Sequence, residues 1–307
     1  MPFVTVGKEN SGSISLYYED HGSGLPVVLI HGYPLSGQAW EKQEPALLEF
    51  GYRVVTYDRR GFGKSSQPNL GYDYDTFAAD LNALVSQLDL HDVVLVGHSM
   101  GTGEIIRYLA AYGSDRVRKA VLVSPLAPCL KKTDGNAVGL DRRVFDGFAA
   151  ACRADRPAWM KRFLHDFYNF DVLGGKTVSD QAYQASWNGA TAASAIGALA
   201  CIGAWGTDFR ADLPKIDVPV LVIQGDADRI LPIDLTGNRL PGLIEDMELV
   251  VIAGGPHAIA WTHADRINRL LLDFIQPAPR KPGRENRTQR VDDDVESLFL
   301  GDWTWKG

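Results

Sequence analysis

The chain has 307 residues, of which 45% are apolar and 22% charged, and its formal net charge is -7. This composition is that of a globular protein long enough to bury a large core, and the acidic balance argues against nucleic acid and anionic membranes as partners. The three cysteines (Cys129, Cys152 and Cys201) are odd in number and follow no metal-ligand spacing, which favours a reduced, cytoplasmic setting.

Eight short apolar runs, rich in β-branched residues, predict strands. In chain order they cover 4–6, 14–18, 27–30, 54–57, 93–96, 120–123, 220–223 and 249–252. Several are apolar throughout, as strands buried on both faces of a sheet should be. Helical periods alternate with these runs. The alternation predicts an α/β fold with a mostly parallel eight-stranded sheet flanked by helices.

Apolar residues at helical spacing predict where the intervening helices lie. One helix is expected over 77–88 with Asp75 as its N-cap, one over 40–50, one directly after Ser99 and one over 267–275. An acidic cap is expected because its carboxylate accepts hydrogen bonds from the free amides of a helix's first turn.

The alternation of strand and helix breaks between about residues 127 and 212, where aromatic residues are frequent and no strand-like run occurs. We interpret 127–212 as a helical cap inserted between a first part of the core, 1–126, and a second part, 213–276. The longest uncharged stretch, 189–207, is dominated by alanine, glycine, serine and threonine. Its transfer to a bilayer is too weak to predict a membrane span.

Beyond residue 276 the chain becomes polar and rich in proline and charge, so 277–307 is predicted to be a flexible C-terminal extension. The end of this extension is apolar and aromatic (Leu298, Phe299, Leu300, Trp303 and Trp305). Such an end predicts either a peptide that docks to a partner protein or shell, or a segment that packs on its own subunit or a neighbour. The sequence is also compatible with a homo-oligomer.

A serine between two glycines follows the apolar run VVLV. Gly97-His98-Ser99-Met100-Gly101 fits G-x-S-x-G and leads into a helical period, which is the strand–turn–helix context of a nucleophile elbow. In so sharp a turn, a Cβ at either glycine would collide with the neighbouring strand or helix. The pattern therefore predicts Ser99 as a nucleophile, with a plain strand-to-helix turn as the alternative.

A serine hydroxyl needs a base to take its proton and a carboxylate to orient that base, and in such folds the acid precedes the histidine. Two predicted strands are followed by Asp226 and Asp228 and then by His257, at the sheet edge where α/β proteins bind ligands. We predict His257 as the base and prefer Asp228 as the acid, since Asp226 lies closer to its strand and can hold the turn's amides. His98 is the weaker alternative base, because adjacent side chains diverge on a sharp turn.

Acyl transfer places negative charge on the former carbonyl oxygen, which two backbone amides usually stabilise. One amide follows the nucleophile and is that of Met100. The other comes from the loop after the strand at 27–30, and we choose Tyr33, since Pro34 has no N–H. We expect the backbone of this loop to be more important for function than the imidazole ring of His31.

The sequence resembles the α/β-hydrolase fold and, within it, the cofactor-free bacterial haloperoxidases, also called perhydrolases. The matching stretches between residues 3 and 276 are HGYPLSGQAWE, YDRRGFGKSSQP, GYDYDTFAADL, GHSMGTGEIIRY, GDADRILPI and PHAIAWTHAD. The resemblance implies a triad of Ser99, Asp228 and His257 with the Tyr33 and Met100 amides as oxyanion donors. The extension beyond residue 276 has no counterpart in the family, and the cap stretch ASAIGALACIGAW has unusually small side chains.

These observations predict a serine-dependent acyl-transfer enzyme with no metal or organic cofactor. Its substrates would be a small ester or carboxylic acid, with hydrogen peroxide and a halide as further reactants. A carboxylesterase, lactonase or lactamase would use the same machinery. Dehalogenases and epoxide hydrolases of this fold use an aspartate nucleophile, so Ser99 argues against them. A catalytically silent binding protein is the alternative from another class.

Overall fold

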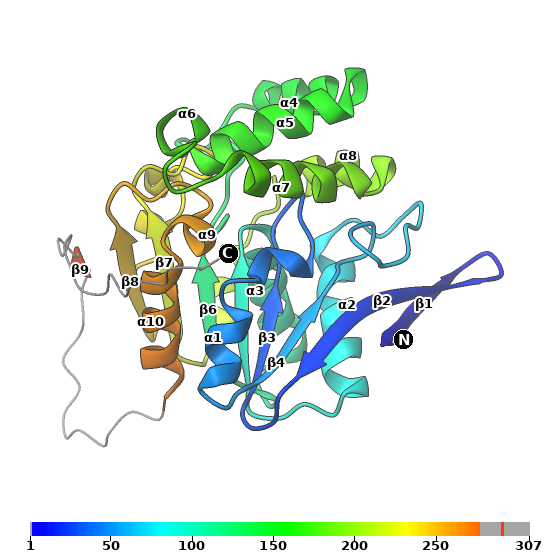
Figure 1. Ribbon diagram of the computed structural model, residues 1–307, viewed down its shortest axis with the longest axis vertical. Coiled ribbons are helices and arrows are strands. Elements are labelled where there is room, and N and C mark those ends of the chain that lie inside the picture. Colours follow the sequence, from blue (N-terminus) through cyan, green and yellow to red (C-terminus); the bar gives the residue numbers. More distant parts are fainter. Residues whose placement is uncertain (1, 277–289, 292–307) are drawn as a thin grey trace, which may run out of the picture.

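A computed structural model describes residues 2–276 and 290–291, whose strands form a single sheet in the order β1-β2-β4-β3-β5-β6-β7-β8-β9 (Figure 1). The strands are β1 (Phe3–Glu9), β2 (Gly12–His21), β3 (Pro26–Ile30), β4 (Arg53–Tyr57), β5 (Val93–His98), β6 (Val117–Val123), β7 (Val220–Gly225), β8 (Met247–Ile252) and β9 (Arg290–Val291). Strands β1 and β2 pair antiparallel, β2 also pairs antiparallel with β4, and every later pair is parallel. The predicted α/β fold is confirmed, and the eight expected strands correspond to β1 to β8, whereas β9 was not expected.

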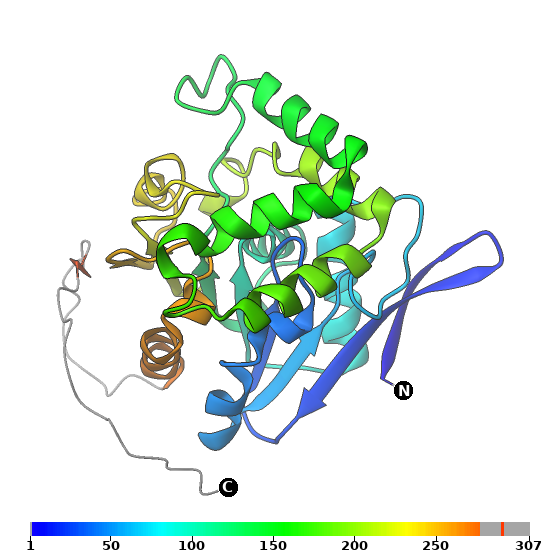
Figure 2. The ribbon, with the colours of Figure 1, turned by 45° about the horizontal axis from the view of Figure 1, so that its top comes forward.

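The helices connect these strands and cover both faces of the sheet. They are α1 (Glu44–Glu49), α2 (Tyr74–Gln87), α3 (Met100–Tyr112), α4 (Arg142–Ala154), α5 (Arg156–Tyr168), α6 (Phe170–Leu173), α7 (Asp180–Ala192), α8 (Ala195–Ala204), α9 (Ile259–Thr262) and α10 (Ala264–Ile275). Helices α4 to α8 lie between β6 and β7 in the chain and sit together over the carboxyl ends of the strands (Figures 1 and 2). They therefore stand over the edge of the sheet where loops from β3, β5, β7 and β8 emerge.

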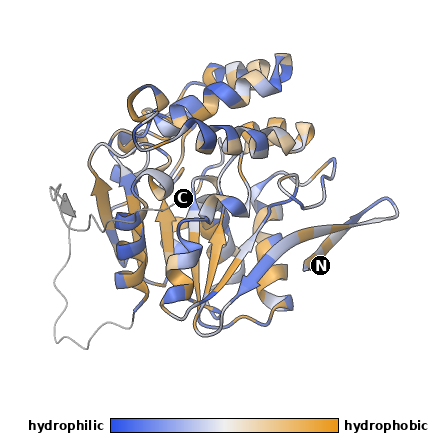
Figure 3. Ribbon diagram, in the orientation of Figure 1, coloured by the Kyte–Doolittle hydropathy of each residue, from blue (hydrophilic) through white to orange (hydrophobic). Residues whose placement is uncertain are grey.

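The central strands send alternate side chains into two cores. Val28 and Leu95 join the core that includes α2 and α3, whereas Leu29 and Val94 join the core that includes α1 and α10. The apolar colour of the middle strands in Figure 3 reflects this burial on both faces. A sheet covered on both sides is a rigid support for the loops at its carboxyl edge.

Two local predictions were wrong. Helix α2 is capped by Asp73, whose side chain accepts a hydrogen bond from the Thr76 amide, and not by Asp75, which lies in the first turn. The single helix expected over 40–50 is divided into a 3-10 turn, Gly37–Trp40, and α1. The Trp40 side chain is fully buried, so packing rather than helical period decides the course of the chain there.

The structure also describes the uncharged stretch and a small part of the extension that the sequence singled out. The uncharged stretch 189–207 is divided between α7 and α8, and in the described part of the chain no helix is long and apolar enough to cross a membrane. Strand β9 pairs with β8 and is the last strand at that edge of the sheet. The rest of the predicted extension, including its aromatic end, lies outside the described residues.

Two bidentate arginine–aspartate pairs that differ in burial allow a test of what holds the core together. Arg60 and Asp80 join the loop after β4 to α2, and their side chains are 6% and 3% exposed. Arg53 and Asp20 join β4 to β2 and are 30% and 25% exposed. We expect Asp80→Ala to lower the free energy of unfolding by about 3–5 kcal/mol, because it leaves a buried guanidinium unpaired.

The matched variant Asp20→Ala should cost at most about 1 kcal/mol, because water solvates the freed Arg53. Urea unfolding of both variants measures the difference. Equal losses would mean that burial does not decide the contribution of these pairs.

Candidate active site

Ser99 stands at the junction of β5 and α3 in a backbone conformation that side chains rarely adopt, with φ 54° and ψ -117°. A Cβ at Gly97 would lie 2.6 Å from the backbone of Gly101, and a Cβ at Gly101 would overlap the carbonyl oxygen of Ile30 on β3. The two glycines therefore let the strand, the turn and the helix approach one another. The strain at Ser99 is of the kind that proteins concentrate at functional sites.

His257 follows β8 and is completely buried beside the loop after β7. Its Nδ1 lies 2.7 Å from Oδ2 of Asp228, and both side chains are fully buried. Oδ1 of Asp228 accepts hydrogen bonds from the amides of Ile230 at 2.9 Å and Leu231 at 2.8 Å. A carboxylate held in this way orients the imidazole with its proton on Nδ1.

The other imidazole nitrogen of His257 is available for chemistry. Within the described residues, its Nε2 is buried and has no hydrogen-bond partner. The backbone carbonyl of His257 accepts hydrogen bonds from His98 Nε2 at 3.0 Å and from Ser124 Oγ at 3.2 Å. Since His98 directly precedes Ser99, this contact brings the loop of His257 against the serine turn.

Asp226 and His98, the two alternatives from the sequence, have other contacts. Asp226 is exposed, and its Oδ1 accepts a hydrogen bond of 2.7 Å from the Gly254 amide. Burial, followed by the nearby His257, lowers the pKa of His98 to about 3, so its ring is neutral at ordinary pH. Because its Nε2–H is donated to a carbonyl, His98 acts in this structure as a structural link between the two loops.

A cavity of about 510 Å³ opens over the serine. Ser99, Met100 and Tyr33 line one part of this cavity. Helices α4 and α5 form most of the remaining wall, which includes the aromatic residues Phe148, Trp159 and Phe163. A mainly apolar pocket of this size accommodates a small organic substrate. Arg143, Arg162 and Arg229 also line it.

The amides of Tyr33 and Met100 both adjoin the serine. Met100 is the first residue of α3, so its N–H has no acceptor within the helix. A Cβ on Gly32 would lie 2.8 Å from the Cβ of Ser99, which shows how closely the loop before Tyr33 approaches Ser99. Among the hydrogen bonds of the described residues, none uses the Tyr33 or Met100 amide as donor. These amides are therefore free to meet an oxyanion.

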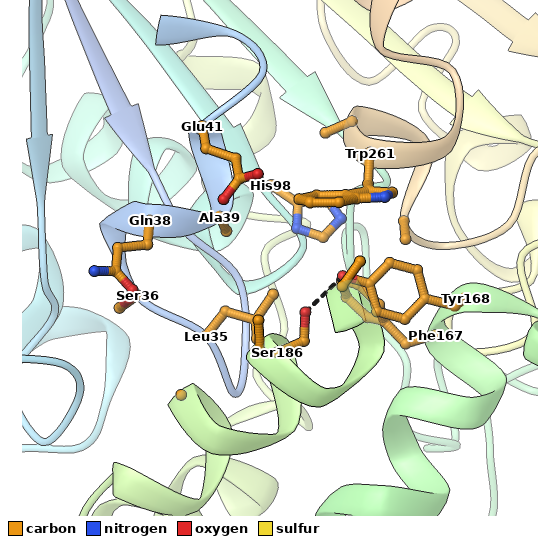
Figure 4. A pocket seen from close by; sticks show the side chains of 15 residues that line it. Leu35, Ser36, Gln38, Ala39, Glu41, His98, Phe167, Tyr168, Ser186 and Trp261 are labelled. Atoms are coloured by element: carbon orange, nitrogen blue, oxygen red, sulfur yellow. Dashed lines mark hydrogen bonds between the residues drawn. The ribbon is translucent and has the colours of Figure 1, made fainter. Parts of the chain in front are cut away.

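A second, smaller cavity of about 90 Å³ has His98 in its wall (Figure 4). Its walls come from the loop at 35–41, from α7 and from α9, and include His98 and Ala258. Tyr168 and Ser186 form a 2.8 Å hydrogen bond at its border. Ser99 does not line this smaller cavity, whereas it does line the larger one, so the larger cavity is the candidate substrate site.

The residues that could share a metal ion lie away from these cavities. Within the described ranges, Glu19, His21 and Glu44 have ligand atoms within 4.8 Å of one another, on β2 and α1. None of the three lines the cavity that contains Ser99.

The sequence analysis missed a buried ion pair beneath the site. Arg59 Nε lies 2.8 Å from Glu104 Oε2, and both side chains are almost completely buried. The sequence did contain a signal for this pair, because Glu104 interrupts the apolar helical pattern after Ser99. A charged side chain at a buried helical position is normally paired with an opposite charge.

Comparisons with known proteins extend over most of the chain. A family model described as the alpha/beta hydrolase fold matches residues 26–264. A protein of Synechocystis sp., provisionally named a non-heme chloroperoxidase, is 61% identical over 276 residues, covering 90% of this chain and 100% of that protein. A bifunctional esterase/perhydrolase of Acinetobacter calcoaceticus is 37% identical over 284 residues, covering 90% and 100%. The crystal structure of a bromoperoxidase from Bacillus anthracis is 45% identical with a TM-score of 0.85, covering 89% and 99%.

Proposed function

This chain belongs to the α/β-hydrolase family, among the non-heme chloroperoxidases and esterase/perhydrolases, and from that membership we propose a serine-dependent acyl-transfer mechanism. Ser99 is the nucleophile, His257 the general base and acid, and Asp228 the carboxylate that orients the imidazole. The observation that carries the proposal is the Asp228–His257 hydrogen bond, which leaves a buried, unpartnered Nε2 beside the serine turn. A base prepared in this way activates a serine hydroxyl.

In the first half of the reaction, Ser99 Oγ bonds to the carbonyl carbon of an ester or carboxylic acid while its proton passes to His257 Nε2. The carbonyl oxygen becomes negative and accepts hydrogen bonds from the Tyr33 and Met100 amides. The C–O bond to the leaving group then breaks, and His257 returns the proton to that group. An acyl-enzyme and an alcohol, or water when the substrate is the free acid, are the products of this half.

In the second half, a small acceptor releases the acyl group. Water or hydrogen peroxide gives a proton to His257 Nε2 while its oxygen bonds to the acyl carbon, and the bond to Ser99 Oγ then breaks with return of the proton to the serine. Water yields a carboxylic acid, and peroxide yields a peracid. A peracid oxidises bromide or chloride in solution, so haloperoxidase activity needs no redox group of the protein.

An esterase, lactonase or lactamase without peroxide chemistry is the second candidate, and the large, mainly apolar cavity over Ser99 supports it. The acyl-enzyme is common to both functions, so they differ only in the acceptor. A preference of about 1.4 kcal/mol for peroxide over water would change the partition tenfold. A binding protein without catalysis would have no need for the strained serine or the buried carboxylate–imidazole pair.

We expect the enzyme to brominate monochlorodimedone in the presence of acetate, hydrogen peroxide and bromide, because peracid formation uses the same acyl-enzyme as hydrolysis. A relative is named as both esterase and perhydrolase, which favours this dual outcome. The rate should be unchanged by chelators, should need the carboxylic acid, and should disappear in Ser99→Ala.

Parallel measurement of p-nitrophenyl acetate hydrolysis separates the alternatives. Ester hydrolysis without any peracid would leave the plain esterase or lactonase. Bromination that needs no carboxylic acid, or that survives Ser99→Ala, would mean direct halide oxidation and would contradict the acyl-enzyme route.

A further inference from the structure

The ring of His31 is hydrogen-bonded on one side to the loop after β4 and on the other to the loop that contains the Tyr33 amide. His31 follows β3 and is fully buried. Its Nε2 accepts a hydrogen bond of 2.9 Å from the backbone N–H of Arg59, and its Nδ1 lies 2.9 Å from the carbonyl oxygen of Gly32. Because a neutral imidazole carries one proton, acceptance at Nε2 places that proton on Nδ1, which donates to Gly32.

The carbonyl of Gly32 and the N–H of Tyr33 belong to one peptide group. A trans peptide group is planar, and its C=O and N–H point in opposite directions. A bond that fixes the direction of the Gly32 oxygen therefore also fixes the direction of the Tyr33 amide. The same oxygen accepts a second hydrogen bond of 3.1 Å from the Leu35 amide, so two donors hold this peptide plane.

We infer that His31 is a positioning residue: its Nδ1–H holds the Gly32 carbonyl and thereby aims the Tyr33 amide at the oxyanion of the acyl-transfer reaction. This inference rests on the proposed function, since it takes the Tyr33 amide as an oxyanion donor. It adds a role for the ring of His31 to the role that we expect for the backbone of this loop.

A buried ion pair connects the backbone of His31 to the helix that begins beside the nucleophile. Arg59 Nη2 donates to the carbonyl oxygen of His31 at 2.8 Å, while its Nε pairs with Glu104 on α3. The hydroxyl of Tyr57 donates to the other carboxylate oxygen of Glu104. Helix α3 and the loop of Tyr33 carry the two proposed oxyanion donors. Both are therefore hydrogen-bonded to the same guanidinium group, that of Arg59.

The surroundings of His31 keep its ring neutral. Burial, and then the positive charge of Arg59, lower its pKa well below the ordinary value of 6.5. A neutral ring with a fixed tautomer is a permanent donor to Gly32 over the pH range in which esterases are assayed. His31 is therefore suited to hold a peptide group in place, and its proton takes no part in turnover.

The test compares His31→Leu with His31→Asn in the full-length protein. Leucine fills a similar volume but donates nothing, so we expect kcat for p-nitrophenyl acetate to fall about 100-fold, as when an oxyanion donor is lost, with KM changed less than about threefold. Labelling of Ser99 by a fluorophosphonate should slow by a similar factor, because that reaction also develops an oxyanion. Asparagine places an N–H near the position of Nδ1 and should recover at least about tenfold of the lost kcat.

A stability control is required because both variants alter a buried site. Leu84→Ala creates a cavity in the core at a fully buried position of α2, outside the loop of Tyr33, and so lowers stability. All variants are assayed well below their own Tm, and Leu84→Ala should keep the wild-type kcat.

Three results would overturn the inference about His31. These are a His31→Leu enzyme with wild-type kcat, equal losses in the leucine and asparagine variants, or an equal loss of kcat in Leu84→Ala. If the wild-type protein neither hydrolyses the ester nor reacts with the fluorophosphonate, the proposed function itself fails. An active wild type with an equally active His31→Leu variant contradicts the positioning role alone.

Discussion

Replacing Ser99 by alanine is expected to lower kcat for ester hydrolysis by on the order of 10⁶. The change removes the oxygen that forms the acyl-enzyme, and no other hydroxyl occupies the tight turn between β5 and α3. His257→Ala should cost a similar factor, because the base and the nucleophile act as one unit. Hydrolysis of p-nitrophenyl acetate under saturating substrate measures kcat, and the Tm of each variant reports whether the fold is intact.

Ser124 provides a matched control for this experiment. It is a buried serine at the end of the neighbouring strand, it also has a positive φ of 48°, and its hydroxyl contacts the backbone of His257. Ser124→Ala removes one neutral hydrogen bond of about 1 kcal/mol, so its kcat should stay within about tenfold of the wild type. If Ser99→Ala were as active as Ser124→Ala, the enzyme would not use Ser99 as its nucleophile.

The strands and the serine turn could be predicted because their signals are local. A run such as VVLV is apolar at every position, and this alone indicates a strand buried on both faces. The glycines beside Ser99 are needed by the turn itself, because a Cβ at either position would meet backbone atoms of the neighbouring segments. Asp228 and His257 could be placed near Ser99 from the sequence because the carboxyl ends of parallel strands share one edge of the sheet.

Features that depend on local backbone angles or on contacts between distant segments could not be predicted in this way. The choice of Asp73 over Asp75 as a cap is decided by backbone angles at the entry to α2, which composition does not reveal. The tautomer of His31 depends on the Arg59 amide, 28 residues further along the chain. The partner of Glu104 is likewise brought close only by the packing of α3 against the sheet.

The roles of Asp226 and Asp228 lead to the last prediction. Asp228→Asn is expected to reduce kcat by on the order of 10⁴, because an amide no longer fixes the imidazole with its proton on Nδ1. Asp228 is buried and contacts His257 at 2.7 Å, whereas Asp226 is exposed and holds only the amide of Gly254.

Asp226→Asn keeps an oxygen that can accept the hydrogen bond from Gly254. Its kcat should therefore stay within about threefold of the wild type, because a surface substitution of this kind changes a free energy by about 0.5 kcal/mol. The two substitutions are chemically identical and two positions apart, which makes each the control for the other. Both are measured with p-nitrophenyl acetate, together with the Tm. A severe loss in Asp226→Asn with a mild one in Asp228→Asn would reverse the assignment of the acid. Mild effects in both would mean that His257 acts without a carboxylate, because no other acidic side chain among the described residues contacts its Nδ1.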